Sequence, residues 1–268
     1  MTGAQTSTFA GAGGRLGLTT WEGEGQTVIG LHGFTLRGGM FDDVVDGRSF
    51  VAPDLPGHGR SRIEDVSMTG TVGALVSLIE TMDDPGVIVG YSMGGRIGLH
   101  LALERPDLVP GLVVISSGLG IADSEERRTR RSADEVLASE IIEVGVERFI
   151  DRWIEQPITG TGRLPEDVRD ADRTLRLVHD AAPLAAALIG LGPGNHDPLH
   201  ERLIELTMPV TWMAGGDDPK YAALAHDASA RTGGRAVIVD KAGHNLVLER
   251  PEAVTGTIRE SVAMFEGR

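Results

Sequence analysis

The pentapeptide Gly90-Tyr91-Ser92-Met93-Gly94 could hold a hydroxyl nucleophile on a sharp turn. It follows an apolar run at residues 87–89 and precedes a helix-like segment that begins near Arg96. A strand, a Gly-x-Ser-x-Gly turn and a helix together form a nucleophile elbow, in which small residues are needed because strand and helix pass close together. We therefore predict that the Ser92 hydroxyl stands clear of a sheet and that the Met93 N–H points into the same space.

Two carboxylates and a histidine occur late in the chain, where they could activate this serine. A serine hydroxyl is a weak base or nucleophile unless an imidazole takes its proton and a carboxylate orients the imidazole. Asp217 and Asp218 follow a β-rich run, and His244 follows the last such run. Parallel sheets hold their sites at the carboxyl ends of strands. We predict a catalytic triad of Ser92, Asp218 and His244, with Asp217 as the rival for the acid.

A second group of residues lies after an early β-rich run at residues 27–31. There the N–H of Phe34, beside that of Met93, could complete an oxyanion hole. His32 and His58 do not follow the final strand, and we expect both to brace loops through hydrogen bonds.

These residues require a sheet with helices between its strands. Before residue 119 the pattern predicts a hairpin at 9–21, strands at 27–31, 50–52, 87–89 and 112–115, and helices at 38–45, 68–82 and 96–104. Residues 119–206 contain no convincing strand and predict helices at 124–142, 146–155, 166–179 and 181–191. After residue 206 strands and helices alternate again, with predicted strands at 210–214 and 236–239 and helices from about 220 and 251.

This order is typical of an α/β-hydrolase fold: a mostly parallel sheet flanked by helices, with a helical cap insertion. We place the core at residues 1–119 and 207–268 and the cap at residues 120–206. The chain order of serine, acid and histidine matches that fold.

Composition and net charge argue against several classes of binding partner. The chain has 268 residues, a net charge of −14 and no cysteine, which argues against nucleic acid, anionic membrane surfaces and thiolate chemistry. We expect a cytoplasmic monomer or small homo-oligomer without cofactor or metal. The histidines and aspartate at residues 196–200 lie in a Pro/Gly-rich turn and lack a His-Glu-x-x-His pair, and the glycines at 11–17 lack the strand and helix that dinucleotide phosphates require.

Arginines suggest the charge of the substrate. Arg96 follows the elbow by one turn, several arginines crowd residues 127–131, and Arg173 and Arg176 lie in a later predicted helix. Most should be solvated surface charges with carboxylates one turn away. Guanidinium groups also bind carboxylates in a bidentate manner, so several of them near a serine elbow indicate a small polyanionic substrate.

Four motifs carry a resemblance to a known family: those at residues 54–59, 90–96, 153–157 and 242–245. Together they resemble the 2-succinyl-6-hydroxy-2,4-cyclohexadiene-1-carboxylate synthases of menaquinone biosynthesis, over nearly the whole chain. The resemblance implies a lyase that eliminates pyruvate from 2-succinyl-5-enolpyruvyl-6-hydroxy-3-cyclohexene-1-carboxylate, with the triad acting as a base.

The resemblance also implies roles for individual residues. Arg96, Arg130 and Arg176 would bind the substrate carboxylates, while Tyr91 and Trp153 would line the pocket. Arg127, Arg128 and Arg131 compete with Arg130 for its role. Ile154, where the family often has an aromatic residue, and the loop at residues 35–40 depart from the family pattern.

Two other functions fit the same core. A serine hydrolase, such as a carboxylesterase or C–C bond hydrolase, would use Ser92 as a true nucleophile. A binding protein with a relict triad would be indicated if Ser92→Ala lost ligand binding without any defect in turnover. The cap arginines favour the lyase, because an esterase for neutral substrates has no use for them.

Overall fold

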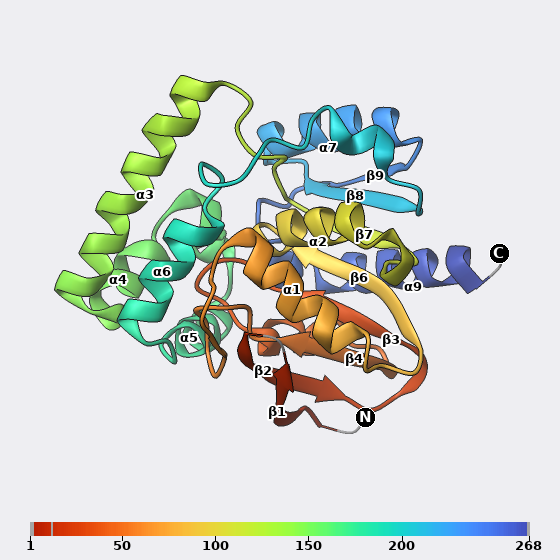
Figure 1. The fold of residues 1–268 in the computed structure, drawn as a ribbon, viewed down its shortest axis with the longest axis horizontal. Coiled ribbons are helices and arrows are strands. Elements are labelled where there is room, and N and C mark those ends of the chain that lie inside the picture. Colours follow the sequence, from red (N-terminus) through yellow and green to blue (C-terminus); the bar gives the residue numbers. More distant parts are fainter. Residues whose placement is uncertain (1–2, 12, 267–268) are drawn as a thin grey trace.

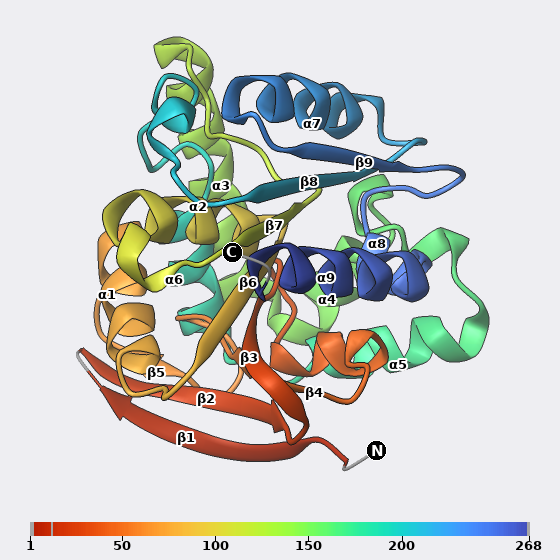
Figure 2. The same cartoon turned by 90° about the vertical axis from the view of Figure 1, so that its right-hand side faces the viewer.

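The computed structural model describes residues 3–11 and 13–266. Within these residues nine strands form one mixed sheet in the order β1-β2-β4-β3-β6-β7-β8-β9, with β5 paired to β2 (Figures 1 and 2). The strands are β1 (Gln5–Gly11), β2 (Gly14–Trp21), β3 (Glu24–Leu31), β4 (Arg48–Pro53), β5 (Arg62–Ile63), β6 (Pro85–Tyr91), β7 (Leu112–Ile115), β8 (Val210–Gly215) and β9 (Arg235–Val239). The pairings β4–β3, β3–β6, β6–β7, β7–β8 and β8–β9 are parallel. Strand β2 pairs antiparallel with β1, β4 and β5.

Helices connect and cover these strands. The α-helices are α1 (Met68–Ile79), α2 (Met93–Glu104), α3 (Ser124–Val144), α4 (Val146–Trp153), α5 (Glu166–Arg176), α6 (Ala181–Leu191), α7 (Pro219–Thr232), α8 (Leu246–Glu249) and α9 (Pro251–Glu266). The short 3-10 helices are η1 (Gly38–Val44), η2 (Pro106–Leu108), η3 (Pro157–Thr159), η4 (Thr161–Arg163) and η5 (Arg202–Glu205).

The central strands are buried on both faces, as parallel sheets usually are. On β6, Ile88 packs into one core with α1, α2 and α7, whereas Val87 and Val89 pack into the other with η1, α8 and α9. Figure 2 shows α1 and α2 on one side of the sheet and α9 on the other. This alternation anchors the strand whose end carries Ser92.

The four helices α3–α6 lie together beside the sheet, between β7 and β8 in the chain (Figure 1). They have a core of their own, in which Ile141, Phe149, Ile150 and Leu184 are fully or almost fully buried. Asp123 caps the N-terminus of helix α3, because its carboxylate accepts from the N–H groups of Glu125 and Glu126.

Among the described residues no single helix is long and apolar enough to cross a membrane. Helices α5 and α6 meet that length and composition only as a pair bent by 93°.

The predicted α/β-hydrolase fold is confirmed, and most predicted elements are found within a few residues of their expected bounds. The elbow helix begins at Met93 rather than Arg96, and α5 ends at Arg176 rather than at residue 179. Strand β5 and helix α8 were not predicted, because two and four residues are too few for a periodic pattern to emerge. The borders of core and cap, at 119/120 and 206/207, stay a prediction.

Candidate active site

Ser92 lies between β6 and α2 with a φ of 51°, in the left-handed region that non-glycine residues rarely adopt. Its N–H donates to the carbonyl of Ile115 on β7 over 2.9 Å. A Cβ added to Gly94 would lie 2.0 Å from the Leu31 carbonyl oxygen, and one added to Gly90 would lie 2.6 Å from the Cα of Gly95. The two glycines therefore permit the close approach that the elbow requires.

The predicted triad is assembled at the carboxyl ends of β6, β8 and β9. The Nε2 of His244 lies 3.2 Å from the Ser92 Oγ, and its Nδ1 lies 2.8 Å from the Asp218 Oδ2. With Nδ1–H donating to the carboxylate, Nε2 is free to accept the serine proton. Asp217 instead faces Arg163, over 2.7 Å, so Asp218 is the carboxylate that contacts the histidine.

Two tyrosines flank the imidazole of His244. The ring centroid of Tyr91 lies 5.7 Å away and that of Tyr221 lies 4.6 Å away. These are the only tyrosines in the sequence, and both are packed against the same ring. Sequence reasoning missed Tyr221, although its place three residues after Asp218, in the first turn of α7, was the available signal.

The two predicted oxyanion donors, Phe34 and Met93, both adjoin Ser92. Met93 is the first residue of α2, and the N–H groups of a first helical turn have no intrahelical acceptor. The Phe34 N–H donates to no acceptor among the described residues. Both residues line the same cavity as Ser92, so both N–H groups are available to a ligand beside the serine.

A cavity of about 300 Å³ opens beside Ser92, under the cap. Its wall includes Arg96, Arg130 and Trp153. A smaller hollow of about 50 Å³ also reaches Ser92 and is lined by Tyr91, Trp153 and Arg176. The structure therefore gathers every predicted site residue around Ser92, including Arg96, Arg130 and Arg176, which follow it in the chain by 4, 38 and 84 residues and come from α2, α3 and α5.

Arg96 is 9% exposed, and its Nη2 donates to the carbonyl of Leu191 over 2.9 Å. Among the described residues it forms no ion pair, and its buried Nε has no hydrogen-bond partner. Burial lowers the pKa of Arg96 to about 10. A buried cation without a carboxylate partner is costly, and an anionic ligand in the adjoining cavity would relieve that cost.

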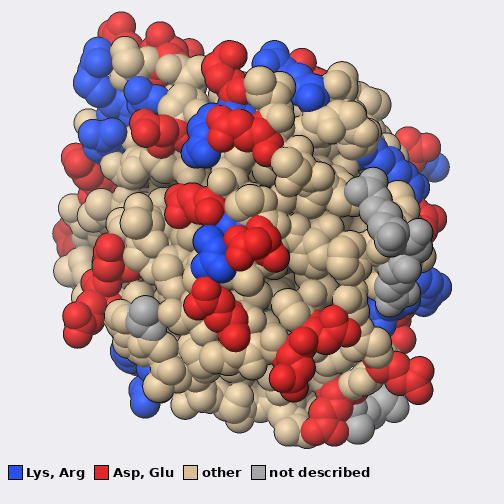
Figure 3. All heavy atoms as spheres, turned by 45° about the vertical axis from the view of Figure 1, so that its right-hand side comes forward, with Lys and Arg blue, Asp and Glu red and all other residues tan. Residues whose placement is uncertain are grey.

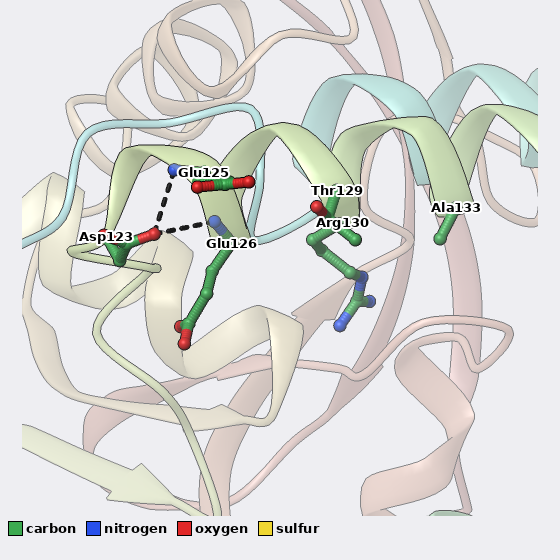
Figure 4. Close-up of a pocket in the computed structure, with 6 residues that line it drawn as sticks. All are labelled: Asp123, Glu125, Glu126, Thr129, Arg130 and Ala133. Atoms are coloured by element: carbon green, nitrogen blue, oxygen red, sulfur yellow. Dashed lines mark hydrogen bonds between the residues drawn. The ribbon is translucent and has the colours of Figure 1, made fainter.

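Arg130 is held from one side by the next turn of α3. Its Nε donates to the Asp134 Oδ1 over 2.8 Å, which leaves the Nη groups free of protein acceptors among the described residues. Figure 4 shows its guanidinium projecting from α3 on the side where Glu126 also extends, at a more open hollow of about 580 Å³. Arg130 lines both this hollow and the cavity of Ser92.

The neighbouring arginines of α3 are used differently. Arg127 donates to the carbonyl of Ile121, and Arg131 donates to that of Gly194. Neither lines the cavity of Ser92, and neither does Arg128. Arg130 is therefore the member of this cluster that the fold turns toward the serine.

Arg176 is almost fully buried, with 2% of its surface exposed. Its Nε donates to the Asp172 Oδ2 over 2.8 Å, and its Nη1 donates to the Thr35 Oγ1. The guanidinium thus joins the end of α5 to the turn that carries Phe34, beside the smaller hollow.

His32 and His58 brace loops, as predicted. The Nε2 of His32 accepts from the Leu55 N–H over 2.8 Å, and that of His58 accepts from the Thr35 N–H over 3.3 Å. Burial lowers the pKa of His32 to about 4 and that of His58 well below its usual value, so both rings are neutral near pH 7. No cluster of candidate metal ligands occurs within the described part of the chain.

Sequence reasoning also missed Lys220, which lines the cavity of Ser92 and lies in the first turn of α7. Its Nζ lies 5.2 Å from the ring centroid of Tyr221. A further hollow of about 480 Å³ is lined by Lys220, Tyr221, Arg130 and His244. Lys220 and Arg130 thus place two cations beside the triad, although Glu155, Asp217 and Asp218 line the same hollow.

Comparison with known proteins adds independent information. A model of the alpha/beta hydrolase family matches residues 28–257. A Bacillus subtilis (strain 168) protein, provisionally named as a 2-succinyl-6-hydroxy-2,4-cyclohexadiene-1-carboxylate synthase, is 32% identical over 84% of this chain and 86% of its own length. A Klebsiella pneumoniae (strain 342) protein named as the same synthase is 28% identical over 88% of this chain and 93% of its own length.

Solved structures agree on the fold. The structure of MenH from S. aureus superposes with a TM-score of 0.87 at 24% identity, covering 93% of this chain and 98% of its own. A thermophilic esterase from Thermogutta terrifontis superposes with a TM-score of 0.82, also at 24% identity, covering 97% and 99%. Enzymes with different names thus share this architecture, so the fold alone does not determine the reaction.

Proposed function

This chain belongs to the alpha/beta hydrolase family and, within it, to the 2-succinyl-6-hydroxy-2,4-cyclohexadiene-1-carboxylate synthases, and on this premise we propose how its residues perform the reaction. The enzyme is a carbon–oxygen lyase of menaquinone biosynthesis. It eliminates pyruvate from 2-succinyl-5-enolpyruvyl-6-hydroxy-3-cyclohexene-1-carboxylate.

The elimination begins with removal of the ring proton beside the succinyl carbonyl. Ser92 takes this proton as its own hydroxyl proton passes to the Nε2 of His244, 3.2 Å away, and Asp218 stabilises the imidazolium that forms. The electron pair of the broken C–H bond moves into the succinyl carbonyl, which becomes enolate-like. The N–H groups of Phe34 and Met93 stabilise that negative charge.

The electrons then shift through the ring double bond and break the C–O bond to the enolpyruvyl group. Pyruvate leaves as its enolate and takes up a proton, and the ring retains two conjugated double bonds. No covalent acyl-enzyme forms, so the triad serves as a base and not as a nucleophile. The balance needs neither an oxidant nor a metal ion.

The observation that carries the proposal is that Arg96 is buried without a carboxylate partner among the described residues. Its guanidinium lies in the wall of the cavity that contains Ser92. The substrate brings three carboxylates, on the ring, the succinyl group and the enolpyruvyl group. Arg130 and Arg176 supply two further cations at the same serine, while Tyr91 and Trp153 provide apolar walls.

The test supplies the succinyl-enolpyruvyl substrate to the purified protein and follows pyruvate release and diene absorbance. Short p-nitrophenyl esters are assayed beside it. We expect Ser92→Ala and Arg96→Ala each to lower kcat/KM for pyruvate release by at least about 100-fold. Arg173→Ala is the matched control, because Arg173 pairs with Asp151 on the outside of the cap.

The alternative, a serine hydrolase, predicts the opposite pattern. Ester cleavage that needs Ser92 but not Arg96, without any pyruvate, would sink the lyase proposal. Binding of substrate without turnover in the wild type would favour a binding protein with a relict triad.

The proposal includes a small polyanionic substrate and no nucleic-acid or membrane partner. In support, Asp and Glu side chains are interspersed with Lys and Arg on the face shown in Figure 3, without a continuous basic surface. A cofactor-free reaction, a monomer or small homo-oligomer, and a cytoplasmic location stay predictions. Activity after dialysis against a chelator, light scattering and cell fractionation would check them.

A further inference from the structure

Thr35, the residue after the proposed oxyanion donor Phe34, has an unusual backbone. Its φ is 66° and its side chain is fully buried. For a β-branched residue this left-handed conformation is a genuine outlier, and such conformations persist only where the surroundings hold them. The contacts that hold Thr35 therefore also determine where the preceding amide points.

All three polar groups of Thr35 are held by side chains. Its N–H donates to the His58 Nε2 over 3.3 Å, and its carbonyl accepts from the His179 Nε2 over 2.7 Å. Its Oγ1 accepts from the Arg176 Nη1. His58 belongs to the core, whereas Arg176 and His179 belong to the end of α5 and the turn after it.

His179 is well defined as a bridge. Its Nδ1 accepts from the Gly59 N–H over 2.9 Å, so its other nitrogen carries the proton that it donates to Thr35. The side chain is 6% exposed, and burial lowers its pKa. The ring of His58 lies 5.3 Å from that of His179 and 5.7 Å from that of Phe34. One neutral imidazole from the cap thus connects two loops of the core.

We propose that His179 is a positioning residue for the oxyanion hole: through the Thr35 carbonyl, and together with Arg176 on the Thr35 hydroxyl, it holds the turn that presents the Phe34 N–H. The inference deepens the proposed function and rests on it. Arg176 also lines the hollow beside Ser92. The same guanidinium would therefore bind a substrate carboxylate and hold, through Thr35, the turn that carries Phe34.

The test compares His179→Phe with His179→Gln, whose amide can both accept and donate a hydrogen bond. Since oxyanion contacts act in the transition state, we expect His179→Phe to lower kcat for pyruvate release by about 10-fold to 100-fold with KM changed less than about 3-fold. His179→Gln should recover most of that loss. His226→Phe, on the exposed side of α7, is the histidine control.

A second readout does not depend on the substrate. The rate at which a fluorophosphonate modifies Ser92, followed by mass spectrometry, reports on the same N–H groups because the phosphonyl oxygen occupies the oxyanion hole. This rate should fall in His179→Phe and recover in His179→Gln. Thr35→Val, which removes the hydroxyl that Arg176 grips, should lower it as well and serves if His179→Phe does not fold.

The outcomes separate the two proposals. Absent pyruvate release in the wild type, with Ser92 modification that still depends on His179, would overturn the lyase function and leave His179 as a positioning residue. Unchanged kcat and modification rate in folded His179→Phe and Thr35→Val, or a loss confined to KM, would overturn the inference.

Discussion

Replacing Arg96 with methionine should make the protein more stable and less active. Burial lowers the pKa of Arg96 to about 10, and the shift from its usual value corresponds to a cost of about 3 kcal/mol for keeping the buried guanidinium charged. The penalty is complete below the folded-state pKa and disappears only as the pH rises past it, so it is fully present at pH 7.5.

Part of this gain is offset in the variant. The hydrogen bond from the Arg96 Nη2 to the Leu191 carbonyl is lost, at a cost of about 2 kcal/mol for a charged donor. Methionine fills much of the same space and adds no polar atom of its own, so the loss is confined to the Leu191 carbonyl. We expect the free energy of unfolding to rise by about 1 kcal/mol, or Tm by about 2–4 °C.

Activity should change in the other direction, because the variant lacks the cation that we propose binds a substrate carboxylate. We expect kcat/KM for pyruvate release to fall by at least about 100-fold, the equivalent of about 3 kcal/mol. Urea unfolding at pH 7.5 and steady-state kinetics measure the two effects, with Arg173→Met as the surface control. A variant that is less stable by 1 kcal/mol or more, or that keeps its kcat/KM, would refute the view that Arg96 is a buried cation kept for substrate binding at a cost in stability.

Three other predictions follow from single contacts. Asp218→Asn should lower kcat by about 10² to 10⁴, whereas Asp217→Asn should stay within about 3-fold, because only the first carboxylate contacts the histidine. Gly94→Ala should lower the free energy of unfolding by at least about 3 kcal/mol, since its Cβ would lie 2.0 Å from the Leu31 carbonyl oxygen. His32, with a pKa lowered from 6.5 to about 4, should contribute a loss of stability of about 3 kcal/mol as the pH falls through that window, because the unfolded state takes up its proton first.

The measurements are steady-state kinetics, thermal or urea unfolding, and urea unfolding at a series of pH values. Equal losses in the two aspartate variants would contradict the triad assignment. Gly216→Ala controls for Gly94→Ala, because its Cβ would lie at an ordinary 3.5 Å from the Val239 carbonyl oxygen. Equal stability of the two variants would argue against the clash at Gly94. An acid profile that does not become shallower in His32→Gln would contradict the third prediction.

Local patterns were enough for the elbow and the order of the elements. The glycines around Ser92 and the apolar run before it are short-range signals, because a tight turn between strand and helix restricts the residues that can occupy it. The alternation of strands and helices, and the helices α3–α6 between β7 and β8, were also legible as periodic patterns. The positions of Asp218 and His244 after late strands followed from the rule that parallel sheets gather their sites at one edge.

Tertiary structure alone decided which of several equivalent side chains enters the site. Asp217 and Asp218 are neighbours of the same type, and only the path of the chain after β8 turns one to the histidine and the other to Arg163. Arg130 differs from Arg127 and Arg131 by its direction from α3, which depends on how the cap packs against the core.

The hydrogen bonds that hold Thr35 could not be predicted from the sequence. Its partners His58 and His179 are 23 and 144 residues away, and each looks like an ordinary loop or helix-end histidine when taken alone. Spacing along the chain specifies contacts only within one element, whereas these contacts depend on the packing of three separate segments. The sequence determined the chemistry that the protein carries, and the packing of cap on core determined which groups present it to a substrate.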